Sequence, residues 1–253
     1  QSRSSAASDV YKRQAWHAAW LDGGVRERQL AYWRGQLGSE HPVLALPSDR
    51  PRAAVARYSA ARHGFALPAP LVDALRARAA EAGASLFMVL LAGWQAVLHR
   101  HTGQQVLRLG VPVAGRQHAG TQGLIGFFVN TLVLQAEVDG RTPLAQVLNA
   151  ARRATLQAQE HQDLPFEQLV EDLQPQRSLA HPPLFQLMFN HVHEDLRGFE
   201  RMTGCMAEAA SVSGGTAQFE LSLEVRERAG GAVRVGMDLS LIHISEPTRP
   251  LYI

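Results

Sequence analysis

The residue under the strongest chemical constraint is Asn130, a single amide in the apolar run GFFVNT at residues 126–131. An Asn side chain carries both a donor and an acceptor, and both need partners when water is excluded. Asn130 therefore either holds nearby backbone by hydrogen bonds or faces a cavity. The residues alone leave both interpretations open.

A second polar cluster is HQDLPFE at residues 161–167, which gathers His161, Asp163 and Glu167 around Pro165. Imidazole and carboxylate groups are the usual agents of general acid–base catalysis. Acids near a helix N-terminus also cap the helix or complement its dipole. A structural role therefore explains this cluster without any catalysis.

Three further residue types have side chains capable of chemistry. Arg116 closes GVPVAGR, where a strand turns into a loop, and such loops often carry function. His191 and His193 would share one face of a strand, but a metal site needs further ligands that the sequence does not identify, so we expect none. Cys205 is the only cysteine and has no predicted activating partner, so we expect an inert thiol.

Composition and missing motifs exclude several function classes. The chain has no GxSxG, GxGxxG, Walker, HExxH or CxxC motif. Its net charge is only +2, from 25 basic and 23 acidic residues, so we expect no nucleic-acid partner. No apolar run approaches the roughly 18 residues of a membrane span, so we expect no membrane partner. The single cysteine fits a reducing compartment, and we expect the cytoplasm.

The two ends differ in composition from the 253-residue chain as a whole. Lys12 is the only lysine, and Ile242, Ile244 and Ile253 crowd a C-terminus that follows a body with one isoleucine. The strings SSAASDVYKRQ and LIHISEPTRP resemble translated sequencing-adapter read-through. We therefore expect residues 1–14 and 241–253 to be foreign and residues 15–240 to be one domain.

Periodicity of apolar residues predicts the elements that position these side chains. We expect a helix over 16–37 broken at Gly23-Gly24, and a helix after Ser85 as N-cap. Further helices are expected at 68–82, 144–159 and from 165, and strands at 62–67, 106–113, 127–138, 184–192, 217–226 and 232–239. This mixed order favours an α/β fold arranged as a two-layer sandwich.

The motifs IGFFVNT, HQDLPFE and RSLAHPPLFQ, in this order, resemble the C-terminal half of a condensation domain of nonribosomal peptide synthetases. The resemblance extends over residues 15–240 and includes LPSDRPR, GVPVAGR and TAQFELSLEV. It implies a chloramphenicol-acetyltransferase-like two-layer sandwich. In that family this sandwich is the C-terminal lobe of a bilobal domain, with the active site in a tunnel between the lobes.

The resemblance also implies the reaction. An acceptor aminoacyl thioester would attack a donor acyl or peptidyl thioester to form an amide bond. Both substrates would be carried on the phosphopantetheine of partner carrier proteins, so no cofactor is expected to bind this chain directly. The implied partners are donor and acceptor peptidyl carrier protein domains, an adenylation domain and the N-terminal lobe of the same synthetase.

The family's catalytic motif HHxxxDG is absent here, since no two of the 11 histidines are adjacent. We therefore assign no catalytic residue and expect the chain alone to be inactive. The resemblance points to Asn130, and after it Arg116, as residues lining the tunnel. It makes His161, Asp163, Pro165 and Glu167 a structural motif.

Two alternatives stay open at this stage. The chain could act as a carrier-protein-docking lobe without catalysis, or belong to a related epimerisation, ester-forming or free-standing acyltransferase domain. A lobe without its partner would expose apolar surface, so we expect the isolated chain to self-associate.

Overall fold

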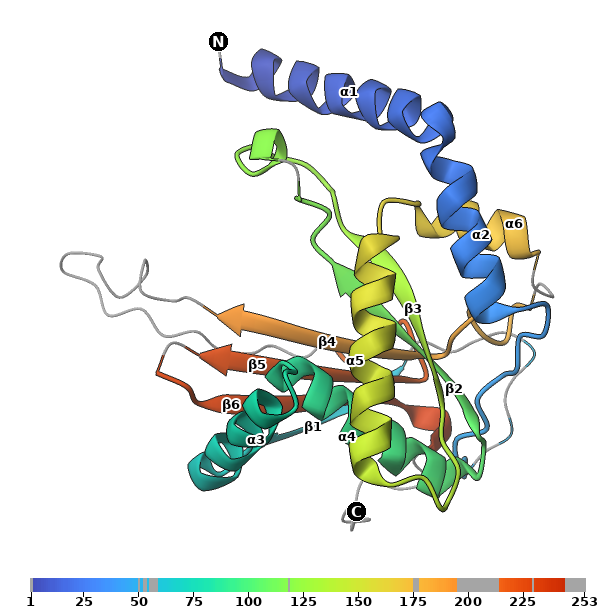
Figure 1. The fold of residues 1–253 in the computed structure, drawn as a ribbon, viewed down its shortest axis with the longest axis vertical. Helices are drawn as coiled ribbons and strands as arrows, with labels where there is room; N and C mark the ends of the chain where they lie inside the picture. The colour runs from blue at the N-terminus through green and yellow to red at the C-terminus, as the bar shows by residue number, and fades with distance from the viewer. Residues whose placement is uncertain are drawn as a thin grey trace.

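A single mixed sheet organises the chain, and the described residues contain six strands in the order β1-β6-β5-β4-β2-β3 (Figure 1). The computed structural model describes residues 2–49, 51, 54, 59–117, 119–174, 178–194, 214–228 and 230–243. The strands are β1 (Ala60–Ala66), β2 (Val106–Val113), β3 (Asn130–Glu137), β4 (Leu187–Glu194), β5 (Leu221–Arg228) and β6 (Val233–Ser240).

Strand pairing mixes both directions. The pairs β1–β6, β5–β6 and β2–β3 are antiparallel, whereas β4 runs parallel to both β2 and β5. The long parallel register between β4 and β5 aligns His191 with Val225 and His193 with Glu227. This register brings side chains that are distant in sequence onto one face.

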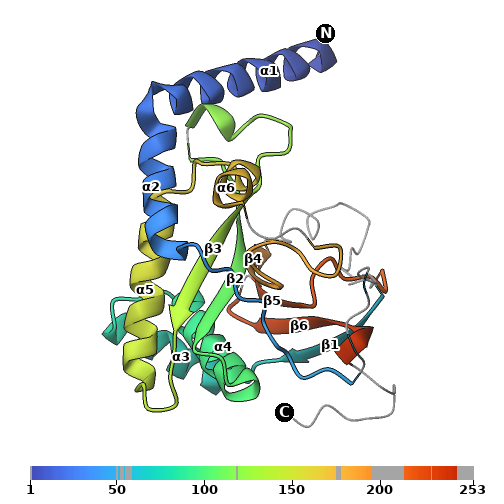
Figure 2. The same cartoon turned by 90° about the vertical axis from the view of Figure 1, so that its right-hand side faces the viewer.

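Helices cover one face of the sheet, with α3, α4 and α5 on the same side (Figures 1 and 2). The α-helices are α1 (Ser2–Trp20), α2 (Arg26–Leu37), α3 (Ala69–Glu81), α4 (Leu86–Thr102), α5 (Leu144–Glu160) and α6 (Phe166–Leu173). The arrangement confirms the expected two-layer α/β sandwich.

The start and end of α4 follow from its sequence. The Ser85 hydroxyl accepts a hydrogen bond from the Met88 amide, as expected of an N-cap. Gly103 ends the helix in the left-handed conformation, with φ of 69°. Between these caps Leu91 and Leu98 are fully buried in the core.

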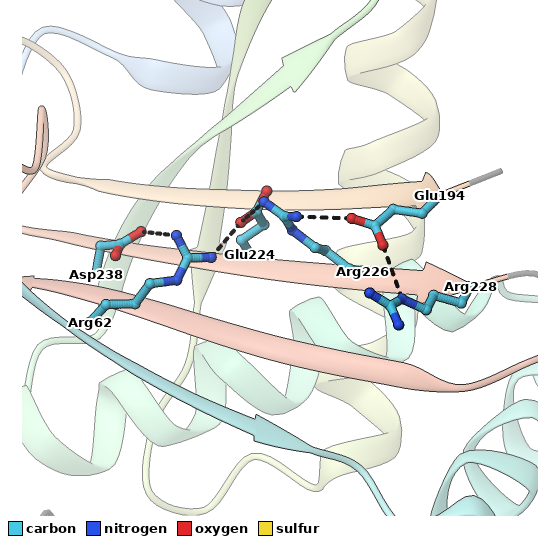
Figure 3. A network of polar contacts seen from close by, with 6 residues as sticks. All are labelled: Arg62, Glu194, Glu224, Arg226, Arg228 and Asp238. Carbon is cyan, nitrogen blue, oxygen red and sulfur yellow. Dashed lines mark hydrogen bonds and ion pairs between the residues drawn. The ribbon is translucent and has the colours of Figure 1, made fainter. Parts of the chain in front are cut away.

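The other face of the sheet carries charge over four strands. Figure 3 shows alternating ion pairs that cross β1, β6, β5 and β4. Arg62 contacts Glu224 at 2.9 Å and Asp238 at 3.5 Å, and Arg226 contacts Glu224 at 3.0 Å. The pairs continue to the end of β4, where Glu194 accepts hydrogen bonds from Arg226 and Arg228. This face therefore keeps its polar side chains mutually paired.

Most expected elements are confirmed, with boundaries shifted by a few residues. The helix expected over 16–37 is broken at the π-helical turn Leu21–Val25, where Gly24 has a φ of 94°. One expectation was wrong: the strand expected from residue 127 begins at Asn130, and Phe127 is 88% exposed. The segment is rich in Val, Leu and Phe and has few charges, which is typical of a buried strand, but the backbone at residues 127–129 is a loop.

Some expectations fall outside the described residues, including the inert thiol of Cys205 and the tail beyond residue 243. Among the described residues, no single helix is long and apolar enough to cross a membrane. Helices α3 and α4 reach that length and apolar character only when they are taken together, and the chain bends by 103° between them.

We predict that Gly110→Ala destabilises the chain. A Cβ on Gly110 would lie 2.3 Å from the ring of Phe185, which is 2% exposed and has little room to move. Overpacking of this kind costs about 1–3 kcal/mol, which thermal unfolding would report as a lower Tm.

Gly64→Ala is the matched control, because a Cβ on that strand glycine would meet only Val235 O at 3.8 Å. Equal Tm values for the two variants would contradict the packing argument.

Candidate functional site

The side-chain amide of Asn130 is fully used by the backbone of the loop between α5 and α6. Its Nδ2 donates to the carbonyls of Gln162 at 2.9 Å and Leu164 at 2.8 Å. Its Oδ1 accepts from the Phe166 amide at 3.0 Å. Asn130 therefore fastens this loop to the first residue of β3.

A second amide, Gln29 of α2, holds the same loop from the other side. Gln29 is 2% exposed; its Nε2 donates to Asp163 Oδ2 at 3.1 Å and its Oε1 accepts from the Leu164 amide at 2.7 Å. Trp33, one turn further along α2, donates its indole N–H to the His161 carbonyl at 3.0 Å. Two amides and one indole thus fix the loop between α2 and β3.

The His161 ring packs against Tyr32 rather than facing a cavity. The two rings stack with centroids 3.9 Å apart and an interplanar angle of 10°. His161 Nδ1 lies 2.8 Å from the carbonyl of Gln157. Burial, together with the charge of Glu160, raises the pKa of Tyr32 to about 12, so its hydroxyl stays protonated.

The acids of the HQDLPFE segment do not cap α6. Pro165 is the N-cap residue and has no side-chain cap hydrogen bond, and the Phe166 amide in the first turn donates to Asn130 instead of to an acid. Asp163 is bound instead to Gln29, so the expected capping role for Asp163 was wrong. Glu167 lies in the first turn, where negative charge complements the helix dipole.

Arg116 organises the loop that precedes β3. Its NH1 donates to the carbonyls of Thr121 and of Leu124, the latter at 2.9 Å, and its NH2 donates to Gly126 at 3.4 Å. The guanidinium also lies over the Phe128 ring, 4.2 Å from the centroid. Arg116 therefore serves as a brace for this loop.

A second arginine shares the same ring. Arg13 of α1 lies 4.4 Å from the Phe128 centroid, and burial and the nearby charge of Arg116 lower its pKa. Beneath them Gly115 has a φ of 63°, and a Cβ there would lie 2.0 Å from Phe128 O. Only glycine allows this close approach of the two loop segments.

These loops and α1 enclose a surface hollow of about 320 Å³. Asn130, Asp163, Pro165 and Glu167 line it, so the structure brings together four of the six residues to which the resemblance gives a tunnel-lining or structural role. Arg116 and His161 do not line it. The remaining lining residues are Arg13, Gln14, Trp16, His17, Gly115, Gln117, Phe127, Phe128, Val129 and Gln162.

Sequence reasoning did not find the α1 and α2 residues of this region. His17 Nε2 lies 3.1 Å from the Asp163 carbonyl, and Gln29 and Trp33 bind the same loop. One signal was present: Gln29 and Trp33 are four apart and therefore share a helix face with Leu37. Gln29 on this otherwise apolar helix face would need a hydrogen-bond partner from another part of the chain.

An apolar strip borders the hollow. Ile125, Phe127 and Val129 are 82%, 88% and 48% exposed, whereas Phe128 between them is 6% exposed. Trp16 of α1 is 43% exposed. Large apolar side chains exposed in a row are characteristic of surfaces that contact another protein or domain.

The chain shares its fold with known structures. The X-domain from teicoplanin biosynthesis, solved in complex with OxyB, matches with a TM-score of 0.81 at 20% identity, over 92% of this chain and 52% of that one. A four-domain nonribosomal peptide synthetase bound to AMP and glycine matches with a TM-score of 0.76 at 23% identity, over 86% of this chain and 18% of that one.

Sequence comparison defines the family. The Condensation domain family model matches residues 2–240, and the chain belongs to this family. A linear gramicidin synthase protein of Brevibacillus parabrevis is 47% identical over 175 residues, which are 69% of this chain and 2% of that protein. The chain thus spans a small part of the curated relative it matches.

We predict that Asn130→Asp loosens the loop between α5 and α6. The carboxylate would face the carbonyl oxygens of Gln162 and Leu164 instead of donating to them. Losing these bonds and repelling both oxygens costs at least about 2 kcal/mol. Hydrogen exchange at residues 162–167 should accelerate at least 10-fold.

Asn190→Asp on β4 is the matched control, since Asn190 does not line this hollow. Unchanged exchange at residues 162–167 in Asn130→Asp would refute the fastening role.

Proposed function

We propose that the chain forms one lobe of a condensation domain that joins two carrier-bound thioesters through an amide bond. The observation that carries this proposal is the match of residues 2–240 to the Condensation domain family. Coverage supports a lobe, since the chain spans 52% of the X-domain structure. The exposed apolar strip supports a second lobe packing beside the hollow.

The proposed reaction sets clear chemical requirements. The acceptor amine attacks the donor thioester carbonyl, a C–N bond forms and the C–S bond breaks. The amine loses a proton and the pantetheine sulfur leaves as thiolate, which takes up a proton. Such a step needs an unprotonated amine, donors for the transient oxyanion and close positioning of two tethered reactants.

The hollow suits positioning better than proton transfer. Its Asp163 carboxylate is bound by Gln29, and the His17 ring contacts the Asp163 carbonyl. We propose that Asn130 forms part of the tunnel wall and that Arg116 shapes the adjoining loop. The catalytic imidazole is expected on the other lobe, so the chain alone is proposed to be inactive.

The proposed partners follow from this reaction. They are donor and acceptor peptidyl carrier protein domains, whose phosphopantetheine arms deliver the substrates, an adenylation domain and the second lobe. For this reaction the chain itself is proposed to bind no cofactor directly, and it is proposed to work in the cytoplasm, in line with its single cysteine.

A docking role without catalysis is the second candidate. It is favoured by the exposed strip of Ile125, Phe127 and Val129, which would bind a neighbour even in an inactive lobe. The two candidates differ in one result: only the first requires the domain completed with its other lobe to form an amide.

We predict that Asn130→Ala slows amide formation at least 10-fold in the complete domain. Three backbone bonds to the loop would be lost, and the wall of the hollow would lose its order. The assay combines the domain with two aminoacyl-loaded carrier proteins and measures the dipeptidyl product by mass spectrometry.

Asn190→Ala, on β4 outside the hollow, should retain the wild-type rate. Wild-type rates for Asn130→Ala would end its assignment to the tunnel wall. Product formation by the chain alone would contradict the proposal that the catalytic imidazole belongs to the other lobe.

We also predict that the isolated chain self-associates through its apolar strip. Phe127→Ser removes a side chain that is 88% exposed beside the hollow, so it should shift the chain toward monomer in light scattering. Leu179→Ser, at a residue 76% exposed and outside the strip, is the control. A monodisperse wild-type monomer, or an equal effect of both variants, would contradict this prediction.

A further inference from the structure

A cluster of three ligand-type side chains lies at the ends of β4 and β5, away from the hollow. His191 Nε2 is 3.4 Å from Glu227 Oε2, and His193 Nδ1 is 3.6 Å from the same oxygen. The three ligand atoms all lie within 4.8 Å of one another. The parallel register of β4 and β5 creates this meeting, because it aligns His193 with Glu227.

The Nε2 atom of the buried histidine makes no hydrogen bond within the described residues and lies only at ion-pair distance from Glu227. The His191 side chain is 7% exposed, and its Nε2 is buried without a hydrogen bond within the described part of the chain. The ring is stacked with Phe87 of α4, with ring centroids 6.2 Å apart and an interplanar angle of 8°. An unpaired buried nitrogen is costly, so an additional partner at this point would stabilise the fold.

The third ligand is oriented by a cation on α3. Arg76 NH2 donates to Glu227 Oε1 at 2.6 Å and to the Gly231 carbonyl at 3.3 Å. One carboxylate oxygen is thus held by Arg76, and the other faces the two imidazoles. A carboxylate ligand anchored through its second oxygen is the usual arrangement around a bound metal.

We propose that His191, His193 and Glu227 bind a zinc ion. Bonds of about 2.0–2.1 Å in a tetrahedral site place neighbouring ligand atoms about 3.3 Å apart. The two separations from Glu227 Oε2, 3.4 and 3.6 Å, are close to this value, and all three ligand atoms lie within 4.8 Å of one another. Two imidazoles and one carboxylate form a donor set that zinc accepts, whereas magnesium and calcium prefer oxygen ligands. Water would take the fourth position, on the side where His193 is 75% exposed.

The placement of the ligand atoms agrees with this assignment. The two imidazole nitrogens lie near the same carboxylate oxygen, Glu227 Oε2, so one ion could contact all three ligand atoms. The bound ion would tie the ends of β4 and β5 together and, through Glu227 and Arg76, connect them to α3. The site is therefore expected to stabilise the lobe rather than to take part in amide formation.

The test is zinc binding by the purified chain carrying a tag without histidines. Titration against a chromogenic zinc chelator should give one site in the wild type, and zinc should raise Tm. His193→Ala should weaken zinc binding at least 10-fold and abolish the rise in Tm. His193 is 75% exposed, so this variant is expected to fold normally.

His63→Ala is the matched control, since His63 is an exposed strand histidine on β1 outside the cluster. It should bind zinc as the wild type does. Absence of a wild-type site, unchanged affinity in His193→Ala, or equal losses in both variants would overturn the proposal. Magnesium should neither compete for zinc nor raise Tm. Because the readouts are binding and Tm, they are independent of the proposed amide-forming activity.

Discussion

The site region depends on one constraint: the loop between α5 and α6 must satisfy its backbone groups away from regular secondary structure. Asn130 and Gln29 do this from opposite sides with their amides, which offer a donor and an acceptor each. A carboxylate could only accept and an ammonium could only donate. The amide type is therefore required at both positions, and the loop joins α2, β3 and α6.

Much of the fold could be predicted from the sequence because its signals are local. Ser85, Gly103 and Gly24 act within one turn of the helix ends that they set. The strand predicted from residue 127 was wrong, because the apolar residues before β3 are typical of a buried strand, whereas β3 begins at Asn130 and Phe127 is 88% exposed. Arg116 donates to three carbonyls of that loop, and these contacts cannot be inferred from the local apolar pattern.

The site was predicted in part for the same reason. The sequence singled out Asn130 because it is the one amide in an apolar run. Two roles were considered for it, binding backbone or facing a cavity. In the structure Asn130 has both, because it binds backbone carbonyls and also lines the hollow. Gln29 could not be paired with Asp163 without tertiary structure, since they are 134 residues apart. Glu227 likewise joins His191 and His193 only through the register of two parallel strands.

The two faces of the sheet divide the requirements of folding and binding. On the face opposite α3, α4 and α5, Arg62, Arg226 and Arg228 each contact a carboxylate, so the strands there pair their charges with one another (Figure 3). Asn130 and Arg116 form hydrogen bonds within the loops at the hollow, whereas Trp16 and Phe127 leave apolar surface exposed there. A protein surface that packs on these apolar residues would therefore also close off the hollow. A second lobe that covers the strip would exclude water from the place where two tethered substrates could meet, which is the condition under which fixed donors act most strongly on a developing charge.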